Sequence, residues 1–566
     1  MADSRNTARP TSGVQGVRLA QRAGKAAGAL VSLCILVGLF AYLILFAPLA
    51  GLNDPQAAAV KGEYRVAQLE TGRICPARMS LADSGAYGDE SFRTSAGNIE
   101  SSLRAAAVGS VAGSSVSALN GQDTAVLTHP GSSSGSQTDP SSSSPSDTSD
   151  TPSANTLSNP QAAPSHTPGS LYTLNRDTNN GPAVMDTTFL KADAGTGSAG
   201  SVVSWATQGD LRGISSASCV QPQLAQSFLS LPTRTGWAQK LVLMNASSKA
   251  TVATVSVHGT SGASALALSS NSTVTVGARS QAVVDLSAAA SGQDGLYVTV
   301  RSSAAPLAGV ITATHMDGLN PQGSDYITPL PAAANRQVIG TLGGGRSASV
   351  IVYSAESGNV RISWITSDGV ENARTASVEG GKVTVISLGD IPDNAKAFQV
   401  ESDTGISAAA VSSTGTPEQG DFAFIPSQAP ASHSAVAIPD KAGGTLTVTN
   451  TGQDDAEVTV SGYGPAGSYA GSKNITVKAG TSQVFASSDI AENAAVLTMD
   501  TGKGAAGSSA GTASGASQRR AAVTMSLAVT VKDVSDASVN GISALNAASL
   551  DPSSQNVAVR NGIVVR

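Results

Sequence analysis

Residues 241–259 (LVLMNASSKATVATVSVHG) decide the fold, because their pattern returns at residues 446–464 (LTVTNTGQDDAEVTVSGYG) at a constant offset of 205 with no gap. In Glu457-Val-Thr-Val-Ser461, valines alternate with polar residues. This period of two is typical of a β-strand with one buried face and one solvated face. The two stretches therefore predict two copies of the same β domain.

A third copy lies between them. Ser349-Val-Ile-Val-Tyr353 is followed by a turn and by a second strand pattern over 360–368. Repeats about 95 residues long are whole domains, because solenoid units span about 20 to 50 residues. Short strands separated by Gly, Asn, Asp and Ser, without a helical period, predict tandem antiparallel β-sandwich domains that resemble immunoglobulin-like or fibronectin-like domains in architecture.

The modules also end alike. Residues 321–329 (PQGSDYITP) and 417–426 (PEQGDFAFIP) each follow a strand pattern. Joints of this kind, bounded by proline, should keep neighbouring domains close.

The composition agrees with several small domains. Among 566 residues there are 59 Gly, 9 Phe, 9 Tyr and 3 Trp, and 13% of residues are charged. Chains of small side chains make thin cores, which favours several small β domains over one large enzyme core.

The N-terminal region predicts a membrane anchor. Residues 26–52 (AAGALVSLCILVGLFAYLILFAPLAGL) contain no charged side chain and are long enough to cross a hydrocarbon core about 30 Å thick. Five basic residues and one acid precede this stretch, so the N-terminus is predicted to be cytoplasmic and the rest extracytoplasmic. A cleaved signal peptide is the alternative, although its apolar region is usually about 7 to 15 residues long.

The charge of the exported part bears on its partners. The net charge of the chain is −6, and the tail with five bases and one acid carries +4, which leaves −10 for the remainder. An acidic remainder predicts no nucleic-acid partner.

These patterns give a domain map. The predicted boundaries are 1–25 for a basic cytoplasmic tail, 26–52 for the transmembrane helix, 53–235 for an N-terminal β domain with a disordered Ser/Pro-rich insertion at 129–169, and 236–334, 335–431 and 432–566 for three β-sandwich repeats, the last with a flexible loop at 502–517.

Two cysteines lie beyond the predicted anchor, Cys75 and Cys219. An oxidising compartment favours a disulfide between them, and closing a loop of this length stabilises a fold by about 5 kcal/mol at most. The Ser-rich tract lies between the two cysteines. If the disulfide forms, the tract is an insertion within one N-terminal domain. The alternative is that the tract is a linker between two domains.

The sequence predicts no catalytic, cofactor-binding or metal-binding residues. Two Gly-x-Ser-x-Gly matches, at 131–135 and 507–511, lie in low-complexity sequence without the strand-to-helix turn that this motif requires. The five histidines are scattered singly, and the loops at 83–90 and 175–186 lack the full ligand pattern of a calcium loop. Trp364 shares a strand face with Val360 and Ile362, which predicts core packing.

The layout resembles an uncharacterised actinobacterial family of membrane-anchored envelope proteins with a conserved domain of unknown function. Residues 205–213 (WATQGDLRG), 219–222 (CVQP) and 241–259 carry the resemblance. It implies a location on the outer side of a Gram-positive cytoplasmic membrane, within the cell wall. It supplies no catalytic residues.

We therefore expect a non-enzymatic envelope protein, tethered by one helix in the membrane, whose β domains form a scaffold or interaction array with other envelope proteins. A cell-wall glycan-binding protein is the first alternative. An envelope hydrolase or transferase is the least favoured, because no module combines a nucleophile, a base and an orienting group.

Overall fold

The computed structural model describes residues 62–81, 94–129, 171–269, 272–502, 522–552 and 554–559. Of the described residues, 59% lie in strands and 3% in helices, and the protein contains several antiparallel sheets. This confirms the predicted mostly β character with antiparallel pairing. The chain divides into two compact units. The unit of residues 1–66 and 554–566 contains β34 (Ser554–Val559) and all but the last residue of β1 (Gly62–Ala67), and these two strands form a sheet.

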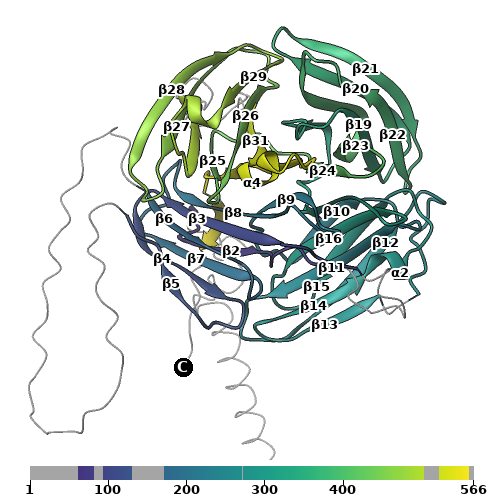
Figure 1. Cartoon of the computed structure of the whole chain (residues 1–566). Coiled ribbons are helices and arrows are strands. Elements are labelled where there is room, and N and C mark those ends of the chain that lie inside the picture. Colours follow the sequence, from purple (N-terminus) through teal and green to yellow (C-terminus); the bar gives the residue numbers. More distant parts are fainter. Residues whose placement is uncertain are drawn as a thin grey trace, which may run out of the picture. The chain divides into compact units, whose positions relative to one another are not determined.

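The unit of residues 67–553 consists of four modules with the same strand order (Figure 1). The first module has sheets β2-β7-β4-β5 and β6-β3-β8-β9, and the second has β10-β15-β12-β13 and β14-β11-β16-β17. The fourth repeats this order as β25-β30-β27-β28 and β29-β26-β31-β32, with β33 added beside β25. In the third, the long strand β23 pairs with β18, β19, β20 and β24 and so takes the place of two strands.

The strands of the first two modules have the following bounds. The first contains β2 (Glu70–Cys75), β3 (Glu100–Val108), β4 (Val111–Ala118), β5 (Ala125–Val126), β6 (Tyr172–Arg176), β7 (Ala183–Phe189), β8 (Gly197–Ala206) and β9 (Gly213–Ser218). The second contains β10 (Ala225–Ser230), β11 (Trp237–Asn245), β12 (Thr251–His258), β13 (Thr273–Val276), β14 (Ser280–Asp285), β15 (Leu296–Ser302), β16 (Ala308–Asp317) and β17 (Asn320–Ile327).

The other two modules follow in the same way. The third contains β18 (Ala334–Ile339), β19 (Ser347–Ser354), β20 (Gly358–Thr366), β21 (Val370–Val378), β22 (Val383–Asp390), β23 (Ala395–Gly415) and β24 (Gly420–Pro426). The fourth contains β25 (His433–Ala437), β26 (Ala442–Asn450), β27 (Ala456–Tyr463), β28 (Tyr469–Val477), β29 (Thr481–Ala486), β30 (Val496–Asp500), β31 (Val523–Val531), β32 (Ser543–Asn546) and β33 (Ala548–Ser549). The short helices α2 (Leu286–Ala289), η3 (Ser487–Asp489) and α4 (Lys532–Asp536) are connectors.

The sequence repeat has a structural cause at the turn after the first long strand of a module. Asn245 is fully buried, and its amide donates to the carbonyl oxygens of Lys249 and Gly277 while its Oδ1 accepts from the Ser247 amide. Asn450 makes the corresponding bonds in the fourth module. The asparagine therefore recurs because it satisfies backbone groups that the turn leaves unpaired.

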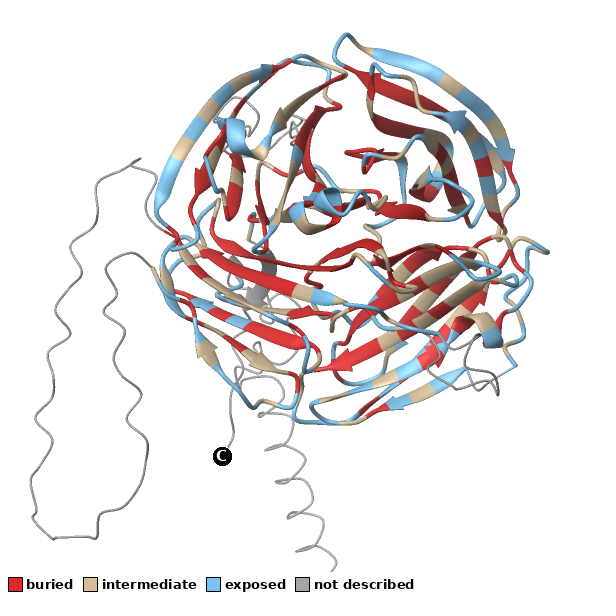
Figure 2. Ribbon diagram, in the orientation of Figure 1, coloured by how far each residue is buried: buried red, intermediate tan, exposed pale blue. Residues whose placement is uncertain are grey.

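The modules share their apolar cores with their neighbours. Trp205, on β8 of the first module, is 4% exposed and packs in the core of the fourth. Phe424, on β24 of the third, belongs to the core of the second. Trp364 is 6% exposed beside Val360 and Ile362, which confirms its predicted core position. Figure 2 accordingly shows buried residues concentrated on the inner strands and alternating exposure on outer strands such as β21 and β28.

One strand of each module lies at the centre of this unit; these strands are β9, β17, β24 and β32. β17 contacts β9 and β24, and β32 contacts β24 and β9, so the four strands form a closed circuit. The two sequence segments expected to be joints between domains, 321–329 and 417–426, largely form the central strands β17 and β24. The modules are thus packed around a common centre and are not arranged as a row of separate beads.

Two parts of the domain map differ from the structure. Strand β10 lies within the predicted N-terminal domain 53–235 but pairs with β15 of the second module, because its side chains complete that module's core. Strand β34 lies within the predicted repeat 432–566 but pairs with β1, outside the four modules. The first module, which shows no sequence repeat, has the same strand order as the others.

Four predicted segments lie outside the described residues. They are the basic tail at 1–25, the transmembrane helix at 26–52, most of the insertion at 129–169 and all but the start of the loop at 502–517. β3, before the insertion, pairs with β6, after it, so the tract connects strands of one module. In the part of the chain that the structure describes, no helix has the length and apolar character needed to span a membrane.

Candidate functional sites

Asp325, on β17, is the first of two carboxylates at the centre of the four modules. Its side chain is 0% exposed. Oδ1 accepts from the Ser216 amide at 3.0 Å, the Tyr326 amide at 3.0 Å and the Ser543 hydroxyl at 2.9 Å. Oδ2 accepts from the Phe424 amide at 2.8 Å. The donors come from all four modules, so this single side chain links them.

Asp421, on β24, is the second central carboxylate and is 1% exposed. Its Oδ2 accepts from the Ile214 amide at 3.0 Å and the Ile542 amide at 2.9 Å, and its Oδ1 accepts from the Phe422 amide at 3.0 Å. These donors belong to the first, fourth and third modules. Glycine at position 323 lets β17 approach closely, since a Cβ there would lie 2.4 Å from Asp421 Oδ1.

Burial controls the ionisation of both carboxylates. Burial raises the pKa of Asp325 to about 8 against the opposing effect of its hydrogen bonds. Burial also raises the pKa of Asp421, and repulsion from Asp325 adds to the effect while the backbone hydrogen bonds oppose it. A raised pKa is often associated with catalysis, but every oxygen here already accepts a protein donor, which indicates a structural role.

An aromatic pocket lies between the second and third modules. Trp237 stacks on His315 with ring centroids 4.0 Å apart and an interplanar angle of 8°, and Phe422 tilts against Trp237 at 5.4 Å. These rings line a cavity of about 300 Å³ together with Gln322 and Thr414. Burial lowers the pKa of His315, partly offset by Asp317, so its imidazole is neutral at pH 7. The pocket thus combines aromatic surface with a few polar groups, as small-molecule sites do.

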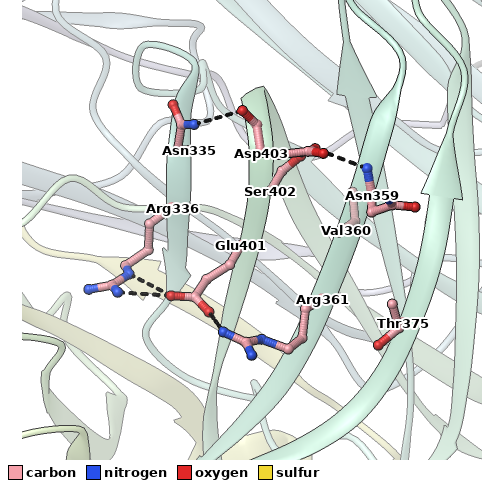
Figure 3. A pocket seen from close by; sticks show the side chains of 9 residues that line it. All are labelled: Asn335, Arg336, Asn359, Val360, Arg361, Thr375, Glu401, Ser402 and Asp403. Carbon is pink, nitrogen blue, oxygen red and sulfur yellow. Dashed lines mark hydrogen bonds and ion pairs between the residues drawn. The ribbon is translucent and has the colours of Figure 1, made fainter.

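A polar hollow of about 660 Å³ lies on the third module (Figure 3). Glu401 on β23 accepts from Arg336 on β18 at 2.8 Å and also pairs with Arg361 on β20. Burial would raise the pKa of Glu401, but the hydrogen bonds from the two arginines outweigh burial and lower it. At the upper end of Figure 3, Asn335 donates to the carbonyl oxygen of Asp403. The two arginines, Glu401 and Asp403 sum to no net charge, so the hollow has no strong preference for anions or cations.

The structure pairs the two cysteines expected to form a disulfide. The Sγ atoms of Cys75 and Cys219 are 2.01 Å apart. The bond joins β2 to the residue after β9, beside the backbone hydrogen bonds between Ile74 and Val220. It therefore connects the two sheets of the first module.

The loops considered for calcium have other roles or lie outside the description. The whole of 83–90 lies outside the described residues. In the loop at 175–186, Asn179 Oδ1 accepts from Arg78 and Asp177 Oδ1 accepts from the Asn179 amide. No group of three or more His, Cys, Asp or Glu suited to a metal occurs among the described residues.

Sequence reasoning missed the central carboxylates, although a signal was present. Each central strand has a glycine within it or two residues before it, and Ser or Asp follows that glycine within two residues; these glycines are Gly213, Gly323, Gly420 and Gly541. The sequence showed that 321–329 and 417–426 are alike, but not that both segments lie at one centre.

Sequence reasoning also missed the aromatic pocket, because Trp237 and Phe422 are 185 positions apart and meet only across a module boundary.

The fold and these sites define an all-β protein of four like modules around a carboxylate-linked centre. The chain belongs to a family of unknown function, DUF5719, whose model matches residues 174–488, more than half of the chain. This finding confirms the expected conserved domain of unknown function. No curated protein and no solved structure matches the chain.

Proposed function

We propose that this protein is a membrane-tethered, extracytoplasmic component of the cell envelope, of the actinobacterial kind that its sequence resembles. Its four immunoglobulin-like modules act together as a non-enzymatic scaffold for other envelope proteins. The observation that carries the proposal is the central pair of aspartates, because their donors join the four modules into one body. A body of this kind holds several outer surfaces in fixed positions relative to one another.

A scaffold fits the chemistry of the sites better than catalysis does. The two groups with the most perturbed carboxylate pKa values are 0% and 1% exposed and are saturated with protein donors. The hollow around Glu401 contains paired charges. A hydrolase or transferase needs an accessible nucleophile with a base and an orienting group beside it, and the described sites present no such set.

The topology is tested with protease on intact protoplasts. A C-terminal epitope tag should be removed without lysis if residues 67–553 lie outside the membrane. The tag on a cytosolic control protein should survive. Protection of the tag until lysis contradicts the proposed location.

The scaffold role is tested by affinity purification of the full-length chain from detergent extracts after crosslinking in intact cells. We expect the same envelope proteins to co-purify with the wild type in replicate experiments. We expect them to be lost with Asp325→Ala, which breaks the centre. Recovery of the same set with both variants contradicts a role for the assembled modules.

Binding of a cell-wall glycan is the second candidate, and the aromatic pocket favours it. Aromatic rings beside amide and hydroxyl groups suit a sugar, which presents both C–H faces and hydroxyls. We expect Trp237→Ala to reduce sedimentation of the full-length chain with insoluble peptidoglycan about tenfold, the loss of roughly 1.4 kcal/mol of binding.

Tyr469→Ala is the matched control, since Tyr469 is 41% exposed on β28, far from this pocket. Equal sedimentation of both variants and the wild type removes the glycan proposal but leaves the scaffold proposal standing.

A further inference from the structure

Arg73 occupies an unusual position within the first module. Residues 71, 73 and 75 alternate on β2 and point between the two sheets: the Thr71 hydroxyl lies 2.9 Å from that of Ser198 on β8, and Cys75 forms the disulfide. Arg73 Nε donates to the Ser198 hydroxyl at 3.2 Å, and one terminal nitrogen, Nη1, donates to the Cys219 carbonyl oxygen at 3.3 Å. The guanidinium therefore lies half-buried at one end of the sandwich.

This guanidinium has no carboxylate partner among the described residues. Asp551 lies nearby on the wall of the same cavity, but its Oδ1 is 2.8 Å from His433 Nδ1 and its Oδ2 accepts from the Ser432 amide. Burial lowers the pKa of Arg73 to about 10, so the group remains a cation at neutral pH. A partly buried cation without a carboxylate partner favours an anion beside it.

The cavity beside Arg73 has a volume of about 240 Å³, far more than a single water molecule needs. Its wall includes the hydroxyls of Thr71, Thr196 and Ser198 and the amide of Gln221. Nη2 of Arg73 has no protein partner in the part of the chain described. A planar guanidinium with free N–H groups, surrounded by hydroxyl donors, matches the geometry of an oxyanion.

We propose that this cavity is a binding site for a small oxyanion, a phosphate or carboxylate group, which Arg73 holds as its counterion. The oxyanion accepts from the free N–H groups of Arg73, and the hydroxyls complete its hydrogen bonds. The site goes beyond the proposed scaffold function and does not depend on it. The ligand is either a free ion or an oxyanion group on a larger molecule.

Calorimetric titration of the full-length chain tests this site. Inorganic phosphate, glycerol 2-phosphate and acetate are titrated at constant ionic strength set with chloride. We expect at least one of them to bind, and Arg73→Gln to weaken that binding at least tenfold. Binding of inorganic phosphate alone identifies a free ion as the ligand, and binding of glycerol 2-phosphate as well admits a group on a larger molecule.

Arg78→Gln is the matched control, because Arg78 lies in the same module but donates to Ile99 O and Asn179 Oδ1. We expect its affinity to equal that of the wild type. Ser198→Ala removes one hydroxyl and keeps the cation, so we expect about threefold weaker binding even if Arg73→Gln does not fold. The proposal is overturned if none of the three anions binds the wild type, or if Ser198→Ala and every folded Arg73 variant bind as the wild type does.

Discussion

Asp325 at the centre and Glu401 in the hollow of Figure 3 are both carboxylates with several donors, but their surroundings differ. Asp325 is fully buried, and three of its four donors are backbone amides that cannot move away. The side chain of Glu401 is 20% exposed, and its arginine partners are 49% and 61% exposed. Because water can replace the arginines but not the amides, only the central carboxylate should be essential to the fold.

The largest expected effect comes from removing the central carboxylate. Asp325→Ala leaves four buried donors without an acceptor, and we expect the free energy of unfolding to fall by about 3–5 kcal/mol. Urea denaturation of the full-length chain measures this change. Asp317→Ala, at the exposed end of β16, should change it by less than about 0.5 kcal/mol. Equal losses in the two variants would show that the centre does not hold the modules together.

The next effect tests the close approach of β17 to Asp421. At Gly323 the φ angle is +110°, and a Cβ would lie 2.8 Å from Asp421 Cα and 2.9 Å from the Phe422 nitrogen. Gly323→Ala should therefore destabilise the fold by about 2–4 kcal/mol. Gly318 has a φ angle of +59° and open space around it. Gly318→Ala should therefore lower the free energy of unfolding by only about 1 kcal/mol. A cost for Gly323→Ala no larger than this control contradicts the close packing.

The dependence of stability on pH sharpens the comparison further. The pKa of Asp325 is about 8 in the folded protein and about 4 in an unfolded chain. Between these values the folded state binds a proton that the unfolded state lacks, so stability falls as pH rises, by up to about 1.4 kcal/mol per pH unit.

The asparagine side chain in Asp325→Asn cannot titrate. The free energy of unfolding of the wild type should therefore exceed that of the variant by less at pH 8 than at pH 5. Denaturation of both proteins at several pH values measures it. An advantage that grows with pH would mean that the ionised carboxylate is the stable form.

The smallest effect is expected at the hollow. Glu401→Gln removes two partly exposed ion pairs, and we expect the free energy of unfolding to fall by only about 0.2–1 kcal/mol. The difference should disappear in about 1 M salt, where such charges are screened. A loss above about 2 kcal/mol that resists salt would place Glu401 in the same class as Asp325.

The sequence predicted what depends on neighbouring residues and missed what depends on packing across modules. Alternating valines in 457–461 predicted strands, and Asn245 and Asn450 marked equivalent turns, because both features are local. The first module has the same strand order as the others but no similar sequence, so no local pattern could reveal that it is equivalent to them. The roles of Asp325 and Asp421 arise only where four chain segments meet. In the sequence alone, an acidic residue shortly after a glycine is typical of an ordinary turn.

The closed circuit of central strands also bears on how the protein folds as it is made. Ser216 and Ser543 are 327 positions apart, yet their hydroxyls lie 2.6 Å from each other. Amides of early strands must wait for partners that are synthesised hundreds of residues later, and contacts this distant in sequence make folding slow. Until the last module arrives, the inner faces of the first three remain uncovered, so the nascent chain should depend on chaperones that bind exposed apolar strands.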